Sequence, residues 1–334
     1  MHRSKAIVPN IIKTLLLPAA VYAFFLVLTL ALNKQAFGTN MIAMKSMLQQ
    51  SVFGLIVALA FSMHLLSGRI DFSMGAVIIL AAIIGGNIAV KLDAGPYGLL
   101  LFCTLSAVVL SLITGILYIV LRIPPLIVTL AMLLIYEAIS AFLFGGKGIM
   151  IYGNEKMTVF ARWPHLYLLA LISMVGFYFV LTYTRFGHDM RSLANGQHIA
   201  INIGVNEKRN VILTFIIAGF FIGIAATVFV SVQGQARPAS SMSSTAYMFA
   251  AFTPVIIGMY LARFSNIPIG IFVASITMGL LQYGLVSIGV HASLQNVVSG
   301  IFLVLFIGIT SNQQYFIEHQ KQKKRAQQLN INLT

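Results

Sequence analysis

The sequence predicts an all-α membrane protein, a polytopic bundle of transmembrane helices. Of its 334 residues, 59% are hydrophobic and only 8% are charged, whereas a soluble domain carries about 25% charged residues. The mean hydropathy is +0.94, and the hydrophobic residues form long runs separated by short polar stretches. Because so few charges cannot cover a water-facing surface, much of the apolar surface must face lipid.

Ten apolar runs approach the length of about 20 residues that a transmembrane helix needs. They are 11–32, 51–67, 72–90, 97–121, 126–144, 165–183, 211–232, 246–261, 267–286 and 292–310. Runs 51–67 and 246–261 are short, and Pro254 interrupts the second, so each is also compatible with a re-entrant segment. We therefore expect eight to ten spans, with ten favoured, in a single transmembrane domain over residues 1–334. The first run is longer than the apolar part of a cleaved signal peptide, so we expect it to be retained.

The basic residues predict the orientation of the spans. The net charge is +14, but Lys and Arg lie at the ends of apolar runs, which argues against a nucleic-acid partner. With ten spans and a cytoplasmic N-terminus, fourteen of the 21 Lys and Arg residues fall on the cytoplasmic side. This bias predicts that both termini are cytoplasmic. It also predicts that the tail 311–334, with Lys321, Lys323, Lys324 and Arg325, contacts anionic membrane lipid.

A weak internal two-fold repeat relates residues 51–90 to residues 247–286. Each segment reads as a short apolar run, a polar tip and a longer apolar run, and a shift of 195 positions places Asn266 on Asp71 and Gly270 on Gly75. Paired, interrupted apolar segments in two halves of a chain are typical of transporters.

Sequence signatures of enzymes are missing. The chain has no phosphate-binding Gly-x-x-x-x-Gly-Lys-Ser/Thr loop and no His-Glu-x-x-His motif. Seven acidic residues and the single Cys103 leave little for acid–base catalysis, a disulfide framework or a zinc site. We expect neither catalytic residues nor a metal on this chain, and any ATP hydrolysis must take place on another chain.

Two tips between apolar runs have distinctive sequences. The first reads Gly68-Arg69-Ile70-Asp71-Phe72-Ser73-Met74-Gly75, and its aspartate is placed to cap the helix that follows. The second reads Arg122-Ile123-Pro124-Pro125-Leu126, where two prolines end one helix and begin the next.

Both tips resemble motifs of the ribose-type (monosaccharide) ABC importer permeases, Gly-Gly-Ile-Asp-Leu-Ser-Val-Gly and Arg-Ile-Pro-Pro-Phe-Ile-Ala-Thr-Leu. The resemblance implies motif or gating roles for Gly68, Asp71, Ser73, Gly75, Pro124 and Pro125. It extends along most of the chain but weakens after residue 250. Arg69 stands where the family has a second glycine, and the Gly-rich tip expected near residues 261–266 is absent.

A third segment, 184–210, is similar to the stretch by which these permeases dock a short helix into a groove of the ATPase. The matching residues taken as coupling residues are Arg185, Gly187, Arg191, Ala200 and Gly204. The segment is the longest polar stretch between apolar runs and is cytoplasmic by charge. We expect Gly187 and Gly204 to bracket a short helix there, in keeping with helix-in-groove recognition.

The resemblance implies partners as well as a fold. They are an ABC ATPase subunit that binds ATP and Mg, an extracytoplasmic solute-binding protein, and a second permease subunit, identical or different. No cofactor is expected on this chain. The implied location is the bacterial cytoplasmic (inner) membrane, and the implied solute is small and polar, a monosaccharide or a related compound.

Two titratable residues inside apolar runs are candidates for the pathway. Glu137 lies in run 126–144, where a carboxylate is costly. It would line the pathway, bond to a neighbouring helix, or lie near the outer interface. His64 lies at the end of run 51–67 and is more often a packing residue in such a place. The alternative to an ABC importer is an ion- or proton-coupled secondary transporter, in which Glu137, Asp71 and His64 would form a relay.

Overall fold

The computed structural model describes residues 7–310, except 33, 35, 292, 293 and 296, together with residue 312. The long helices are α1 (Ile7–Ala31), α2 (Met41–Leu66), α3 (Met74–Lys91), α4 (Gly95–Leu121), α5 (Pro125–Phe142), α6 (His165–Tyr183), α9 (Glu207–Gln233), α10 (Thr245–Leu261) and α11 (Ile267–Ser287). Two shorter helices, α7 (Arg185–Asn195) and α8 (Gln197–Asn202), connect α6 to α9, and the last described helix covers Val297–Thr310. The basic cluster of the predicted tail lies outside the described residues.

The prediction of an all-α polytopic membrane bundle is confirmed. Eight described helices are long and apolar enough to cross a membrane, and the helices Thr245–Leu261 and Val297–Thr310 are shorter apolar ones. Run 51–67 was delimited too narrowly, because α2 begins at Met41 and has 26 residues. The polar residues Lys45, Ser46, Gln49 and Gln50 interrupt the apolar run but not the helix. α2 is therefore long enough to span the membrane.

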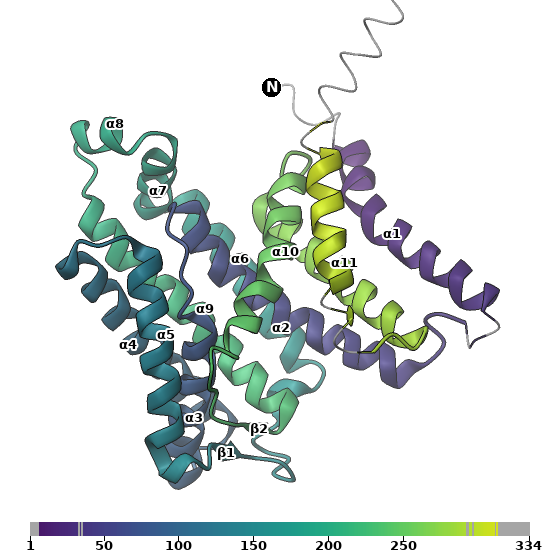
Figure 1. Ribbon diagram of the computed structural model, residues 1–334, viewed down its shortest axis with the longest axis horizontal. Coiled ribbons are helices and arrows are strands. Elements are labelled where there is room, and N and C mark those ends of the chain that lie inside the picture. Colours follow the sequence, from purple (N-terminus) through teal and green to yellow (C-terminus); the bar gives the residue numbers. More distant parts are fainter. Residues whose placement is uncertain are drawn as a thin grey trace, which may run out of the picture.

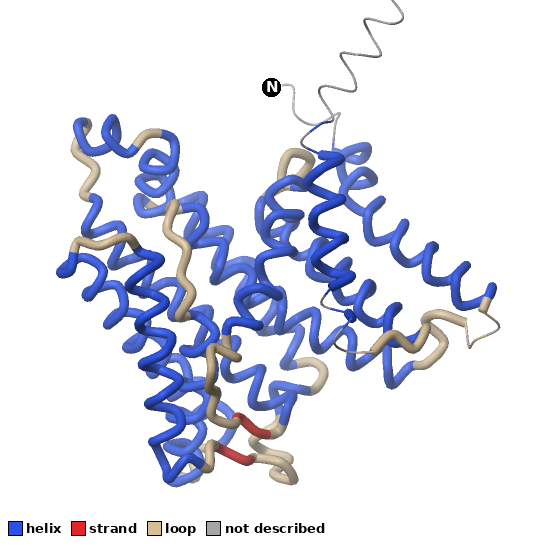
Figure 2. Tube along the Cα trace, viewed as in Figure 1, coloured by secondary structure: helices blue, strands red, loops and turns tan. Residues whose placement is uncertain are grey.

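Two features mark opposite ends of the bundle. Helices α7 and α8 project at one end, and strands β1 (Ile149–Met150) and β2 (Gln235–Ala236) lie at the other (Figures 1 and 2). The strands pair antiparallel, with Ile149 opposite Ala236. We call these ends the α7–α8 end and the strand end.

The helices form two groups that α2 connects. α3, α4, α5 and α9 pack together on one side, and α1, α10 and α11 on the other, with α2 crossing between them (Figure 1). α2 contacts α9 as well as α10 and α11. Its segment 55–64 is buried throughout, so this helix is the axis around which both groups are assembled.

Small residues allow the closest helix contacts. Gly219 and Gly223, four positions apart in α9, face α4, and a Cβ on Gly223 would overlap the backbone of Thr104. This spacing lets two helix backbones approach, as is common in membranes. The two glycines therefore allow α9 to pack closely on α4.

The internal repeat extends to helix order but not to packing. α10 and α11 pack against each other as a hairpin, and Gly270 lies against the backbone of Gly258. The corresponding helices α2 and α3 take other main partners, and Gly75 lies against Ser244 instead. The two tips also differ, because Asn266 is itself the N-cap of α11, whereas Asp71 bonds Ser73, the N-cap of α3.

Candidate pathway and coupling segment

The tip between α2 and α3 is organised by Asp71. Its Oδ1 accepts hydrogen bonds from the Ser73 N–H at 2.8 Å and from the Ser73 hydroxyl at 2.6 Å. Asp71 is 1% exposed, and the turn before it passes through Gly68 at φ +72°, a left-handed conformation that favours glycine. The N-cap of α3 is Ser73, which makes no side-chain cap bond, so Asp71 organises the turn before the helix instead of capping it as predicted, and its two bonds explain why Asp and Ser occur two positions apart.

Gly75 and Glu137 meet at one residue, Ser244, which precedes α10. A Cβ on Gly75 would overlap the carbonyl oxygen of Ser244. Glu137 Oε1 accepts from the Ser244 N–H at 2.9 Å and from its hydroxyl at 2.6 Å, and Oε2 accepts from the Met242 N–H at 2.9 Å. Residues from α3 and α5 therefore fix the point at which α10 begins.

This arrangement supports one of the three interpretations of Glu137. The side chain is 3% exposed, and its three partners are all donors, which suits an ionised carboxylate. Glu137 is a ligand for a neighbouring segment, and it does not line the cavity described below. A buried charge with well-directed donors is compatible with a transmembrane position.

His64 belongs to the tip rather than to a cavity. Its Nε2 lies 3.5 Å from Asp71 Oδ2, and its ring packs edge-on against Phe215 with centroids 4.8 Å apart. The side chain is fully buried and lines neither of the two cavities described below. The structure therefore joins His64 to Asp71 but not to Glu137.

An ion pair at the same tip was not predicted. Arg69 is 6% exposed, and its guanidinium donates to Glu207 Oε1 at 3.0 Å and to the Ser67 carbonyl at 3.2 Å. Glu207 is the first residue of α9 and lies within the coupling segment 184–210. The signal in the sequence was the arginine itself, which stands at a position where the motif has glycine.

Pro124 and Pro125 act as expected. Pro124 is the N-cap of α5 and Pro125 is its first residue. α4 ends at Arg122, whose φ of +55° is left-handed. The prolines therefore separate α4 from α5 with a short, stiff turn, far in sequence from the coupling segment.

The coupling segment folds as two helices instead of the single one predicted. Gly187 lies inside α7, where a Cβ would overlap the Leu181 carbonyl, so it does not bracket a helix. Gly204 follows α8 at φ +96°, as a terminating residue should. α7 carries its apolar residues Phe186, Met190 and Leu193 on a buried face.

The coupling residues proposed from the sequence differ in their surroundings: some are held within the protein and one faces the surface. Arg191 donates to the carbonyl oxygens of Leu181 and of Gly187, the latter at 3.3 Å, and thereby holds α7 against the end of α6. Ala200 is buried, whereas Arg185 is exposed. Sequence reasoning missed the isoleucines of α8 and its flank, since Ile199 is 70% exposed and Ile203 is 73% exposed.

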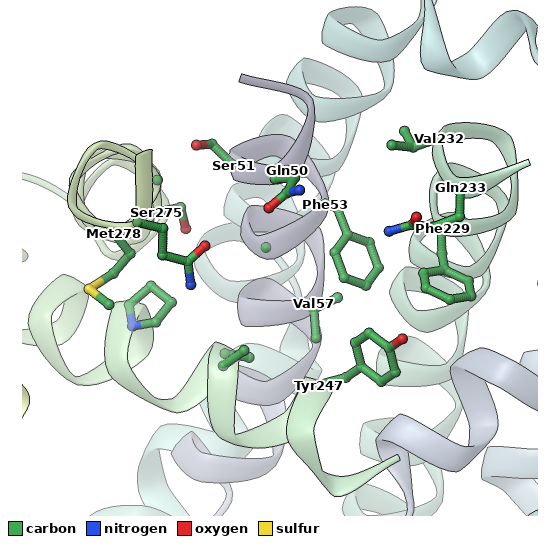
Figure 3. A pocket seen from close by; sticks show the side chains of 16 residues that line it. Gln50, Ser51, Phe53, Val57, Phe229, Val232, Gln233, Tyr247, Ser275 and Met278 are labelled. Atoms are coloured by element: carbon green, nitrogen blue, oxygen red, sulfur yellow. The ribbon is translucent and has the colours of Figure 1, made fainter. Parts of the chain in front are cut away.

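A cavity opens between α2, α9, α10 and α11 in the half of the bundle nearer the strand end (Figure 3). Its volume is about 220 Å³, and a second cavity of about 370 Å³ shares Gln50, Gly279 and Gln282 with it. The two cavities adjoin at these shared residues, and together we call them the α2–α11 cavity. Among the described residues that line it, none is charged.

Four described glutamines, Gln50, Gln233, Gln282 and Gln295, line this space and were not among the predicted site residues. Gln50, Gln233 and Gln282 come from α2, α9 and α11, each at or near the end of a long apolar stretch. An uncharged carboxamide is a weak signal in a sequence, because glutamine also occurs at membrane interfaces. Only the fold shows that these glutamines share one space.

Comparison with known proteins agrees with this architecture. A family model described as "Branched-chain amino acid transport system / permease component" matches residues 43–307. The galactose/methyl galactoside import permease protein MglC of Haemophilus influenzae is 25% identical over 298 residues, which cover 81% of this chain and 87% of that protein. The autoinducer 2 import system permease protein LsrD of Escherichia coli K12 is 28% identical over 263 residues, covering 75% and 78%.

The family model extends from α2 to the last described helix and includes both tips, the coupling segment and the α2–α11 cavity. Together with the apolar helices, it accounts for a multi-pass membrane protein that transports rather than catalyses. The chain belongs to the family of branched-chain amino acid transport system permease components and is a membrane-spanning permease subunit of the ABC-importer type.

Proposed function

We propose that this chain forms the translocation pathway for a small neutral polar solute, a monosaccharide or a related compound. A solute-binding protein would deliver the solute at the strand end, and a separate ATPase, which binds ATP and Mg, would dock on α7 and α8. The chain would work with a second permease subunit in the bacterial cytoplasmic membrane, with its termini on the cytoplasmic side. The α2–α11 cavity, whose largely apolar wall carries uncharged polar groups among the described residues, is the observation that carries the proposal.

The α7–α8 unit supports the docking of an ATPase. α7 is fixed to the membrane helices by Arg191, while α8 presents Ile199 and Ile203. Exposed apolar side chains on a polar segment are typical of a protein interface. A rigid base with an apolar projection is suited to transmit movement of a bound ATPase to α6 and α9.

The relay of a secondary transporter finds less support. Such a relay needs titratable groups along a shared water-filled route. Glu137 is bonded to Ser244 and Met242, and His64 and Asp71 lie together at the α2–α3 tip. These three groups do not line the α2–α11 cavity within the described residues.

Reconstitution with the partner ATPase and binding protein tests the proposal. Uptake of labelled D-galactose or D-ribose into proteoliposomes should require ATP hydrolysis and should withstand a protonophore. A hydrolysis-deficient ATPase serves as the control for the energy source. Uptake that persists with that ATPase and collapses with the protonophore would establish the secondary transporter instead.

A further inference from the structure

The α2–α11 cavity carries polar groups that the protein itself leaves without partners. Among the described residues, the carboxamides of Gln50, Gln233 and Gln282 bond no other protein group; Gln50 and Gln233 are exposed and Gln282 is half-buried, so all three are free to bond water or a solute. Ser275, on the cavity wall, is 4% exposed and its hydroxyl has no partner in the protein. A buried hydroxyl without a partner costs about 1–3 kcal/mol, so a group in the cavity that bonds Ser275 would recover that cost.

A comparison of Gln49 with Gln50 shows that the position of the side chain decides whether the protein bonds the carboxamide. This neighbour of Gln50 donates through Nε2 to the Ala161 carbonyl at 2.7 Å. Adjacent glutamines on one helix therefore have different environments, one satisfied by the protein and one turned into the cavity. Figure 3 shows the Gln50 and Gln233 side chains entering the space from α2 and α9, on opposite sides.

Aromatic rings supply a second kind of surface. Phe53, Phe229 and Tyr247 line the cavity and contact one another, with ring centroids 5.3 to 6.0 Å apart. The rings therefore form a continuous apolar wall opposite Ser275 and Met278 (Figure 3). A solute that meets this wall needs an apolar face as well as hydroxyls.

The lining selects among solutes by charge. A carboxamide both donates and accepts, so it can bond hydroxyls of either orientation. An anion or a cation would leave water for a space without an opposite charge, which is strongly unfavourable. The volumes, about 220 and 370 Å³, are at the small end of ligand sites.

We propose that the permease carries its own recognition site for a neutral polyhydroxylated solute, in which Gln50, Gln282 and Ser275 bond hydroxyls and the Phe53–Phe229–Tyr247 wall contacts the carbon skeleton. The permease thus rejects charged analogues independently of the binding protein. The inference rests on the proposed function for the route by which solute arrives. Its test needs neither the ATPase nor the binding protein, so the two can fail separately.

Cysteine labelling of the purified permease in lipid nanodiscs tests the site. The single native cysteine, Cys103, is buried, so a cysteine placed at Val232 on the cavity wall reports on the space without removing a carboxamide. The probe is an uncharged hydrophilic maleimide. Glu155→Cys is the accessible control, because the Glu155 side chain is 81% exposed, and Ile56→Cys, fully buried, is the inaccessible one.

D-galactose and D-ribose are tested in turn, and at least one of them should protect the introduced cysteine. At saturation it should slow labelling of Val232→Cys by about fivefold or more. D-galacturonate at equal concentration should not slow the labelling. Gln50→Leu should raise the half-protecting sugar concentration about fivefold or more, as expected for the loss of one hydrogen bond. Gln49→Leu is the matched control and should leave that concentration unchanged.

Three results would overturn the proposal. Labelling of Val232→Cys as slow as that of Ile56→Cys would mean that the space is covered, for instance by a second subunit. Protection by neither sugar, or equal protection by D-galacturonate, would remove the selectivity. Protection that survives both Gln50→Leu and Gln282→Leu would remove the carboxamides from the site. Protection without ATP-driven uptake, by contrast, would leave this site in place and refute the proposed function.

Discussion

Glu137 and Ser244 are joined by two hydrogen bonds to a single carboxylate oxygen, from the Ser244 N–H at 2.9 Å and from its hydroxyl at 2.6 Å. The other oxygen accepts from the Met242 N–H at 2.9 Å. Glu137, a candidate for the solute pathway in the sequence, therefore bonds the segment that precedes α10 and does not line the cavity. It sets where α10 starts and, through α10, where one side of the α2–α11 cavity lies.

Glu137→Gln should lower stability more than it lowers the activity of each folded molecule. An amide NH₂ facing the Met242 N–H replaces an acceptor with a donor, and a lost buried hydrogen bond costs about 1–3 kcal/mol. Thermal unfolding in detergent should therefore show a reduced Tm. Glu155→Gln, at a side chain 81% exposed, is the control and should leave Tm unchanged. An unchanged Tm with lost uptake would return Glu137 to the pathway.

Gly75→Ala should be poorly tolerated, because the added methyl group overlaps the Ser244 carbonyl and cannot be relieved without moving backbone. We expect a destabilisation of about 1–3 kcal/mol and a reduced yield of folded protein. Gly176, in α6, is the matched helical control, since a Cβ there meets nothing within 4 Å. Gly176→Ala should be neutral or stabilising by up to about 1 kcal/mol. Equal effects at both positions would refute the close contact.

The Arg69–Glu207 pair should show measurable coupling in a double-mutant cycle. Its side chains are 8% and 29% exposed, so solvent screens the pair only in part. Replacing each partner by alanine, singly and together, should give a coupling energy of about 1 kcal/mol. The exposed pair Glu155–Arg162, 3.6 Å apart with side chains 81% and 53% exposed, is the control and should give a value near zero. Additive effects at Arg69 and Glu207 would contradict a direct link between the tip and α9.

Ile203→Asp should weaken association with the ATPase without harming membrane insertion. The side chain is 73% exposed, so the change costs little in the isolated permease but places a charge in an apolar contact. Co-purification with the ATPase is the readout, and Asn195→Asp, exposed at the end of α7, controls for added charge. Undiminished co-purification of Ile203→Asp would remove α8 from the interface.

Two arginines of α7 should behave differently from each other. Arg185→Glu should weaken association with the ATPase, as Ile203→Asp does. Arg191→Ala should instead lower the Tm of the permease, because the Arg191 guanidinium holds α7 to α6.

The membrane bundle followed from composition and run length, because lipid demands long apolar helices whatever their arrangement. Local turn chemistry was predictable in part: Pro124 and Pro125 begin a helix and Gly204 ends one, whereas Asp71, expected to cap α3, bonds Ser73, the N-cap residue. The start of α2 was misjudged, since Lys45 and Gln49 break an apolar run without breaking a helix. Helix hydrogen bonds do not depend on the polarity of the side chain.

Most of the candidate site could not be predicted from the sequence. Glu137 and Ser244 are separated by 107 positions, and Arg69 and Glu207 by 138, so their pairing depends on how helices pack. Their titratable side chains made Glu137 and His64 candidates for the pathway. In the structure, Glu137 bonds Ser244 and Met242, and His64 lies beside Asp71. The cavity is instead lined by neutral glutamines and aromatic rings from four helices, whose meeting no spacing along the chain reveals.

Blocking the α2–α11 cavity is the most direct test of the central claim that solute crosses the membrane through it. The assembled importer carrying Val232→Cys should lose ATP-driven sugar uptake in proteoliposomes when the cysteine is fully modified with a bulky maleimide. Full modification of Glu155→Cys should leave uptake intact, and the ATPase subunit should remain bound in both complexes. Unchanged uptake after complete modification at Val232 would contradict the account and place the pathway elsewhere in the assembly.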